Sequence, residues 1–201
     1  MRKLLFFFVL AIPFTVFSQI GVKGGINFAN VSNASSINES SRSGFNIGVF
    51  ISPPSKSILS SRTELLFSRQ GYNYKTSTNT GNVNLDYIML PQLLAINLTK
   101  LLQVQLGAQM AYLINAKVDS SGSGSSNPYG VAIMDYYNRF DYGFGIGAEV
   151  HPFKGLLFGV KYNISLGKLY NDAYSGRMPN FASIDAKNNL VQVFTGWRFG
   201  K

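Results

Sequence analysis

Apolar side chains alternate with small or polar ones in one segment after another of this chain. Between residues 20 and 28, Ile20, Val22 and Ile26 fall on one face and Lys23 and Asn27 on the other. A period of two is typical of β-strands whose two faces meet different surroundings. The same alternation recurs in residues 44–52, 101–116, 140–151, 156–167 and 191–199. The pattern predicts an all-β protein with long strands.

Two further segments are predicted to be strands, although their alternation is less regular. Residues 58–74 carry Arg62 and Glu64 on one face opposite apolar side chains, whereas residues 83–96 are apolar on both faces and contain Pro91. Proline donates no hydrogen bond to a ladder and is expected at an edge or a bulge. With these two segments the chain has eight strands, an even number that a closed antiparallel barrel favours.

The connections between the strands alternate in length. The short ones are residues 52–57, 97–100 and 152–155, and the long polar ones are residues 31–43, 117–138 and 168–187. Short periplasmic turns and longer extracellular loops are typical of up-and-down transmembrane β-barrels. The rim of short turns is expected to carry Lys56, Lys100, Lys154 and Lys201. Tyrosines near strand ends predict aromatic girdles, and these are Tyr72, Tyr74, Tyr112, Tyr136, Tyr137 and Tyr170.

Composition bears on which face of the barrel points outward. Only 13% of the residues are charged, whereas a water-facing surface usually carries about 25% or more. A soluble barrel of lipocalin type would turn its apolar face inward around a ligand, and a membrane barrel would turn it outward to lipid. The polar face is rich in Gly, Gln and Asn with lone charges of both signs, which favours the membrane barrel. The predicted lumen charge cluster, with a structural or gating role, is Lys23, Arg62, Glu64, Asp141, Glu149, Lys161 and Arg198.

The N-terminus predicts export. Arg2 and Lys3 precede an almost wholly apolar run over residues 4–17, and Ser18 gives a small residue before the expected cleavage at Gln19. Residues 1–18 are therefore expected to be a signal peptide, and residues 19–201 one barrel domain. The chain has no cysteine, so it has neither a lipid-attachment cysteine nor a disulfide.

Other function classes find little support in the sequence. The 18 basic residues outnumber nine acidic ones, but they are scattered singly, which argues against nucleic-acid binding. His151 is the lone histidine, and Ser68 or Ser165 would have to join it for acyl transfer. One histidine, no cysteine and dispersed aspartates predict no metal site, and no cofactor is expected. We therefore expect no enzyme activity.

Several segments also resemble the PorT-like outer-membrane β-barrel family. They are residues 21–28 (Gly-Val-Lys-Gly-Gly-Ile-Asn-Phe), 63–71 (Thr-Glu-Leu-Leu-Phe-Ser-Arg-Gln-Gly), 85–91, 140–147, 160–167 and the closing Trp197-Arg-Phe199. The resemblance implies an integral outer-membrane barrel of a Gram-negative bacterium whose C-terminal strand is read by the barrel-assembly machinery. It carries over no catalytic residue, and its founding member is associated with the type IX secretion system.

Two functions follow as hypotheses. The first is a structural or interaction barrel that is accessory to protein secretion or envelope integrity, with a protein partner bound through its extracellular loops. The second is a narrow channel or carrier for small solutes or lipids. An eight-stranded barrel has room for little more than its own side chains, which disfavours a general diffusion porin.

Overall fold

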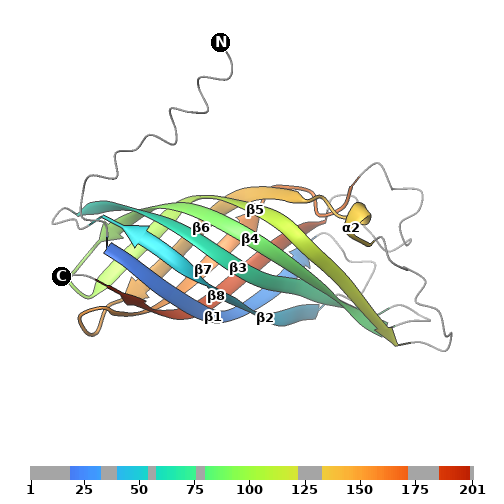
Figure 1. The fold of residues 1–201 in the computed structure, drawn as a ribbon, viewed down its shortest axis with the longest axis horizontal. Coiled ribbons are helices and arrows are strands. Elements are labelled where there is room, and N and C mark those ends of the chain that lie inside the picture. The colour runs from blue at the N-terminus through green and yellow to red at the C-terminus, as the bar shows by residue number, and fades with distance from the viewer. Residues whose placement is uncertain are drawn as a thin grey trace, which may run out of the picture.

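The computed structural model describes residues 19–32, 40–53, 58–75, 80–121, 133–171 and 186–199. Eight antiparallel strands pair in chain order, and β8 pairs with β1 to close the barrel (Figure 1). The strands are β1 (Gln19–Ser32), β2 (Ser40–Ser52), β3 (Leu59–Lys75), β4 (Thr80–Asn97), β5 (Leu102–Ser121), β6 (Phe140–Val150), β7 (Leu156–Ser165) and β8 (Lys187–Arg198). The eight-stranded up-and-down barrel expected from the alternation is confirmed. The expected signal peptide lies outside the described residues.

The apolar face of the barrel points outward. Ile47 and Phe144 are 60% and 57% exposed, and most of the other apolar residues on their faces are similarly exposed. On the opposite face, Arg62, Glu64 and Lys161 are at most 1% exposed. A lipocalin-like arrangement is the reverse of this one, because it would bury the apolar side chains and expose the charged ones. The strands therefore present apolar surface to lipid and polar surface to the lumen.

The two ends of the barrel differ. At one end, here called the turn end, lie the start of β1, the end of β8 and the short connections at 98–101 and 151–155 (Figure 1). At the other, the loop end, lies the short helix α2 (Ile133–Tyr136). Among the described residues, no helix is long and apolar enough to cross a membrane.

Strands β3, β4 and β5 extend beyond their neighbours at the loop end (Figure 1). The ladder between β5 and β6 stops at Tyr112 and Phe140, while β4 and β5 continue to pair as far as Thr80 and Ser121. No described strand pairs with the other edge of β5 beyond Leu113. Within the described part of the chain, this stretch of β5 is therefore a sheet edge.

Pro91 interrupts the ladder between β3 and β4. The pairing stops after Thr63 and Gln92 and resumes at Leu66 and Met89 in the same alignment. Pro91 lacks the N–H that a ladder position requires, and it still aligns with a β5 residue on its other side. The proline therefore lies inside a central strand, at a short break in one ladder.

Candidate functional site in the barrel lumen

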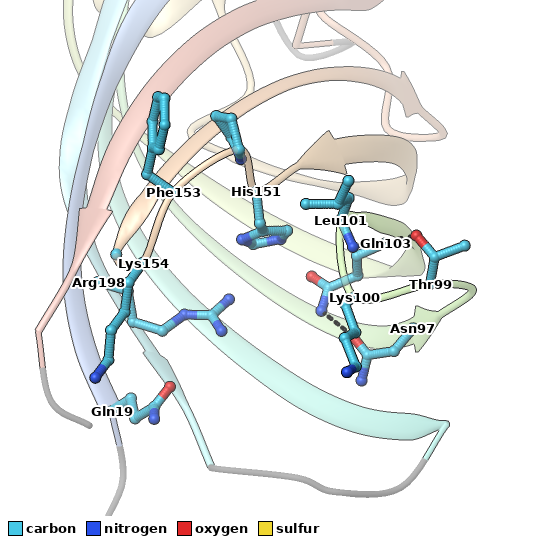
Figure 2. Close-up of a pocket in the computed structure, with 12 residues that line it drawn as sticks. Gln19, Asn97, Thr99, Lys100, Leu101, Gln103, His151, Phe153, Lys154 and Arg198 are labelled. Carbon is cyan, nitrogen blue, oxygen red and sulfur yellow. Dashed lines mark hydrogen bonds between the residues drawn. The ribbon is translucent and has the colours of Figure 1, made fainter.

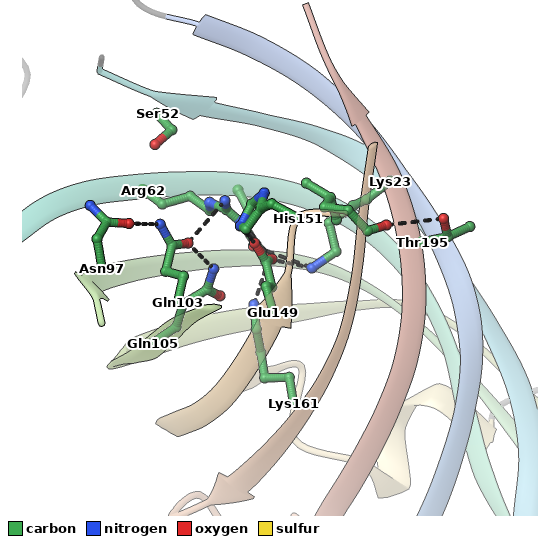
Figure 3. Close-up of polar contacts among 12 residues, drawn as sticks. Lys23, Ser52, Arg62, Asn97, Gln103, Gln105, Glu149, His151, Lys161 and Thr195 are labelled. Carbon is green, nitrogen blue, oxygen red and sulfur yellow. Dashed lines mark hydrogen bonds and ion pairs between the residues drawn. The ribbon is translucent and has the colours of Figure 1, made fainter. Parts of the chain in front are cut away.

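Five charged side chains from four strands meet in the lumen toward the turn end. We call Lys23, Arg62, Glu64, Glu149 and Lys161 the charged layer (Figure 3). The Glu64 carboxylate accepts from Lys161 Nζ at 2.7 Å and from Lys23 Nζ at 3.1 Å. Its Oε1 also lies 3.9 Å from Nη1 of Arg62. One carboxylate therefore holds cations from β1, β3 and β7.

The second carboxylate of the layer holds the Arg62 guanidinium. Arg62 Nη1 donates to Glu149 Oε1, and Nη2 donates to Gln103 Oε1 at 3.3 Å. Gln103 is also a donor, to Asn97 Oδ1 at 2.7 Å. His151 Nε2 lies 3.5 Å from the other Glu149 oxygen. The layer therefore reaches β5 and β6 as well.

Two phenylalanines lie against the cations of the charged layer. Lys23 Nζ is 3.6 Å from the ring centre of Phe194, and the Arg62 guanidinium carbon is 4.5 Å from that of Phe50. Cation–π contacts of this kind contribute about 0.5–2 kcal/mol, more when desolvated. The rings fit because glycines face them: a Cβ on Gly21 would lie 2.1 Å from the Phe50 ring, and one on Gly159 would lie 2.5 Å from that of Phe194.

Three alternate glycines of β6, Gly143, Gly145 and Gly147, make room for the charged layer. A Cβ on Gly147 would lie 2.7 Å from Val160 O and 3.2 Å from Lys161 Cβ, and one on Gly145 would lie 2.7 Å from Asn163 Oδ1. The run is followed by strand and not by a helix, so it does not form a phosphate-binding loop of the nucleotide-binding kind.

The structure brings five of the seven predicted lumen residues together in the charged layer and places Asp141 and Arg198 at other depths of the lumen. Asp141 faces the interior but lies at the loop end, where it accepts a hydrogen bond from Ser165 Oγ at 2.5 Å. It entered the prediction because alternation fixes which face a residue occupies but not its depth in the barrel. Arg198 lies at the mouth of the turn end, where its Nε and Nη2 are buried without a hydrogen bond to any described residue.

A layer of amide side chains follows the charged layer toward the loop end. Asn27 Nδ2 donates to Ser68 Oγ and to the carbonyl of Phe45, each at 2.9 Å. Asn46 Nδ2 and Gln192 Nε2 donate to Asn27 Oδ1 at 2.7 and 3.2 Å. These neutral groups link β1, β2, β3 and β8 across the lumen and fill it.

The loop end of the lumen is filled by apolar side chains and a tyrosine cluster. Leu85, Leu113 and Leu190 belong to the buried apolar group there. The Tyr72 hydroxyl lies 2.6 Å from that of Tyr170 and 3.0 Å from that of Tyr137.

The aromatic-girdle prediction is therefore wrong for Tyr72, Tyr137 and Tyr170, which are at most 5% exposed. They fasten segments that cross the loop end of the barrel to β3. Tyr112 does face outward, 49% exposed, as the girdle requires. The side chain of Tyr74 lies outside the described part of the structure.

The turn end of the lumen is open. A hollow of about 580 Å³ there is lined by residues of several connections and strand ends, and we call it the vestibule. Figure 2 shows Lys154 and Arg198 on one side of it, Lys100 and Gln103 on the other, and His151 between them. The interior of the barrel therefore runs from an open vestibule through the charged and amide layers to an apolar loop end.

The residues considered for acyl transfer do not meet. Ser165 aligns with Gly143 on β6, eight residues before His151, a separation of roughly 26 Å along the strand. Ser68 lies in the amide layer and contacts Asn27. Neither serine forms a triad with His151. Among the described residues, no group of three His, Cys, Asp or Glu side chains could hold a metal ion.

Sequence reasoning missed the two phenylalanines of the site and the glutamine network. The alternation picks out the lipid-facing apolar residues of β2 and β8, and Phe50 and Phe194 lie on the opposite face of these strands. The signal was present, since an aromatic residue out of phase with the lipid-facing set must point into the lumen. Gln103 was assigned to the polar face, but its bond to Arg62 depends on the stagger between strands, which alternation does not encode.

A closed barrel with an apolar outer face and a charged, filled lumen defines an integral outer-membrane β-barrel protein. Residues 16–171 match the family described as Outer membrane protein beta-barrel domain, and the chain belongs to this family. No curated protein matches the chain.

Solved structures of two outer-membrane barrels share the fold. The attachment invasion locus protein Ail of Yersinia pestis is 13% identical, with a TM-score of 0.50 over 90% of this chain and 99% of that one. Neisserial surface protein A is 11% identical, with a TM-score of 0.51 over 90% of this chain and 97% of that one. With the family membership, these likenesses place the protein in the outer membrane.

Proposed function

We propose that this protein is a non-enzymatic scaffold of the outer membrane that acts by presenting its loop end to a protein partner. The observation that carries the proposal is the filling of the lumen at successive levels. Arg62, Glu64 and Lys161 close it toward the turn end, and Tyr72 with its partners closes it at the loop end. A barrel filled in this way anchors and displays its loop end and does not conduct solutes.

The loop end offers a means of recognition. Beyond Leu113, no described strand pairs with one edge of β5, while β4 continues on the other side. Such an edge can accept an extended segment of another protein by strand addition. Lys117 is exposed on this part of β5, which keeps the edge from pairing indiscriminately.

The resemblance to the PorT-like family supports an accessory role in protein secretion or envelope integrity. This finer assignment rests on short motifs such as residues 63–71, and it is part of the proposal. The motif supplies Glu64, which the structure uses to hold the charged layer together. The residues that carry the resemblance therefore stabilise the barrel, and we look for the partner's binding site at the loop end.

Conductance separates the proposal from its rival, a narrow channel or carrier. The purified full chain is inserted into a planar bilayer, and current is recorded beside the Glu64→Gln variant. The proposal expects no steady conductance from the unaltered chain. Steady single-channel steps whose ion selectivity changes in Glu64→Gln would establish the channel instead.

The role of the loop end is tested in a deletion strain scored for protein export and detergent resistance. Because the chain has no cysteine, a Lys117→Cys variant can be blocked with a bulky maleimide at one position. We expect the unblocked variant to restore both properties and the blocked one to lose them. Full function in the blocked variant would remove β5 from the proposed interface.

A further inference from the structure

We propose that the vestibule at the turn end is a binding site for a phosphate monoester. This inference is independent of the partner proposed at the loop end, because it concerns the opposite end of the barrel. It rests on the charge of the vestibule lining, on the unsatisfied donors of Arg198 and on the excess of positive charge in the layer beneath.

The lining of the vestibule is cationic. Lys100, Lys154 and Arg198 contribute three fixed positive charges, with the imidazole of His151 between them (Figure 2). None of the twelve lining residues that the structure describes is Asp or Glu. A concave surface lined by one sign of charge concentrates ligands of the opposite sign, because the low-dielectric walls focus the field.

Arg198 is the best-placed donor of the site. Its backbone N–H donates to Gly155 O at 2.7 Å, which fixes the end of β8 against the turn. Its Nε and Nη2 are buried and make no hydrogen bond to a described residue. A buried donor without a partner is costly, and the planar guanidinium is shaped to bind two oxygens of one phosphate.

The charged layer beneath the vestibule adds to its attraction for anions. Counted by formal charge, Lys23, Arg62 and Lys161 are three cations, whereas Glu64 and Glu149 are two anions. Glu149 is ion-paired with Arg62 and lies beside His151, and the described residues include no direct ion pair between Glu149 and Arg198. A dianion in the vestibule would offset the excess of positive charge in the vestibule lining and in the charged layer.

The size and the surroundings of the vestibule favour a phosphate group that is attached to a larger molecule. A volume of about 580 Å³ exceeds what one phosphate group fills. Exposed apolar residues also flank the lysines at the turn tips, with Leu101 next to Lys100 and Phe153 next to Lys154. The phosphate monoester can therefore come from water, as in a glycerol phosphate, or from a membrane, as in a lipid headgroup.

Calorimetry tests the water-borne source. The folded full chain in nonionic micelles is titrated at low salt with glycerol 3-phosphate, beside glycerol as the uncharged comparison. We expect saturable binding that weakens about tenfold in Arg198→Gln and less in Lys100→Gln or Lys154→Gln. Lys117→Gln removes the same charge at the loop end, and it should bind as the unaltered chain does.

A second arm tests the membrane source. The same proteins are placed in phosphatidylcholine nanodiscs with and without phosphatidic acid, and the unfolding midpoint is recorded. Stabilisation by phosphatidic acid that is lost in Arg198→Gln assigns the site to a lipid headgroup, and a response to glycerol 3-phosphate alone assigns it to a water-borne ligand.

The proposal is overturned if neither probe binds saturably. It is also overturned if Lys117→Gln weakens binding as much as Arg198→Gln, which would show a general charge effect. Heat-dependent gel mobility checks that each variant is folded. Should Arg198→Gln fail that check, the double variant of the exposed Lys100 and Lys154 takes its place.

Discussion

Nζ of Lys161 lies 2.7 Å from Oε2 of Glu64, although 97 positions separate the two residues in the chain. Lys161 belongs to β7 and Glu64 to β3, so the bond crosses the lumen. Both side chains are at most 1% exposed. The same carboxylate also holds Lys23 of β1, and this arrangement makes Glu64 the residue on which the charged layer depends.

Glu64→Gln is therefore expected to destabilise the barrel strongly. The substitution leaves Lys23, Arg62 and Lys161 with Glu149 as the remaining carboxylate of the layer, and breaking a buried pair in this way costs about 3–5 kcal/mol. Urea unfolding in micelles should show the loss. The double variant Glu64→Gln with Lys161→Met removes one charge of each sign, and it should recover part of the stability. A double variant less stable than Glu64→Gln would contradict the role given to Glu64.

Two adjacent glycines on β1 are expected to differ in their tolerance of alanine. A Cβ on Gly25 would lie 2.1 Å from Val193 O and 2.6 Å from Phe194 Cα, inside the barrel. A Cβ on Gly24 would point to lipid, 3.5 Å from its nearest neighbour, Asn46 O. Gly25→Ala should cost about 1–3 kcal/mol because backbone must shift, and Gly24→Ala should change stability by no more than about 1 kcal/mol. Equal unfolding midpoints for the two variants would be evidence against the assigned faces.

Tyr72→Phe should loosen the loop end. It removes the hydroxyl that lies between those of Tyr137 and Tyr170, at a cost of about 1–3 kcal/mol. Hydrogen exchange should speed up at the amides of Asn138 and Asn171, whose bonds tie the two crossing segments together. Tyr112→Phe, on the lipid face, serves as the control and should leave these amides protected. Unchanged exchange in Tyr72→Phe would show that the tyrosine cluster does not hold the closure.

A lysine on the lipid face should destabilise the barrel according to depth. Ile146 lies mid-strand in β6 and is 56% exposed, whereas Ile114 lies on β5 beyond the start of β6 and is 44% exposed. At the middle of the bilayer a lysine costs about 2–4 kcal/mol, and near the interface about 0–1 kcal/mol. Ile146→Lys should therefore be less stable than Ile114→Lys in lipid vesicles. If Ile114→Lys were the less stable variant, the middle of the bilayer would lie nearer to Ile114 than to Ile146.

Single cysteines can establish which end of the barrel faces outward. The chain has no cysteine of its own, and Lys117 at the loop end and Lys154 at the turn end are both exposed. A membrane-impermeant maleimide added to intact cells should label Lys117→Cys. The same reagent should leave Lys154→Cys unlabelled in intact cells and label it once the cells are broken. Labelling of Lys154→Cys in intact cells would reverse the expected topology.

Alternation predicted the number of strands and their faces because lipid and lumen impose opposite demands at every second residue. It placed Lys23, Arg62 and Glu64 inside the barrel correctly, and the structure brings them together. It could not separate Asp141 from them, because depth depends on strand tilt and stagger. Nor could it assign Tyr72, which lies near a strand end as a girdle residue would but points inward.

The vestibule was harder to predict than the charged layer. Its lining joins the turn residues Lys100 and Lys154 to Arg198 at the end of the last strand. The sequence placed the two lysines on one rim, but it gave no indication that the turns surround a hollow. That property depends on where the charged layer stops filling the lumen, and so on packing between strands far apart in the chain.

The charged layer also bears on how one barrel is selected from its close alternatives. Sliding a strand by two residues keeps every apolar side chain toward lipid, so the outer face alone does not distinguish the correct arrangement from a slipped one. Such a slip would move Lys161 by roughly 7 Å along its strand and leave it out of reach of Glu64. Strands β1, β3 and β7 all contribute to the contact at Glu64, so the contact forms when β1 and β8 have paired in the correct register. A barrel closed in a slipped register would leave these buried charges unpaired, and it is disfavoured for that reason.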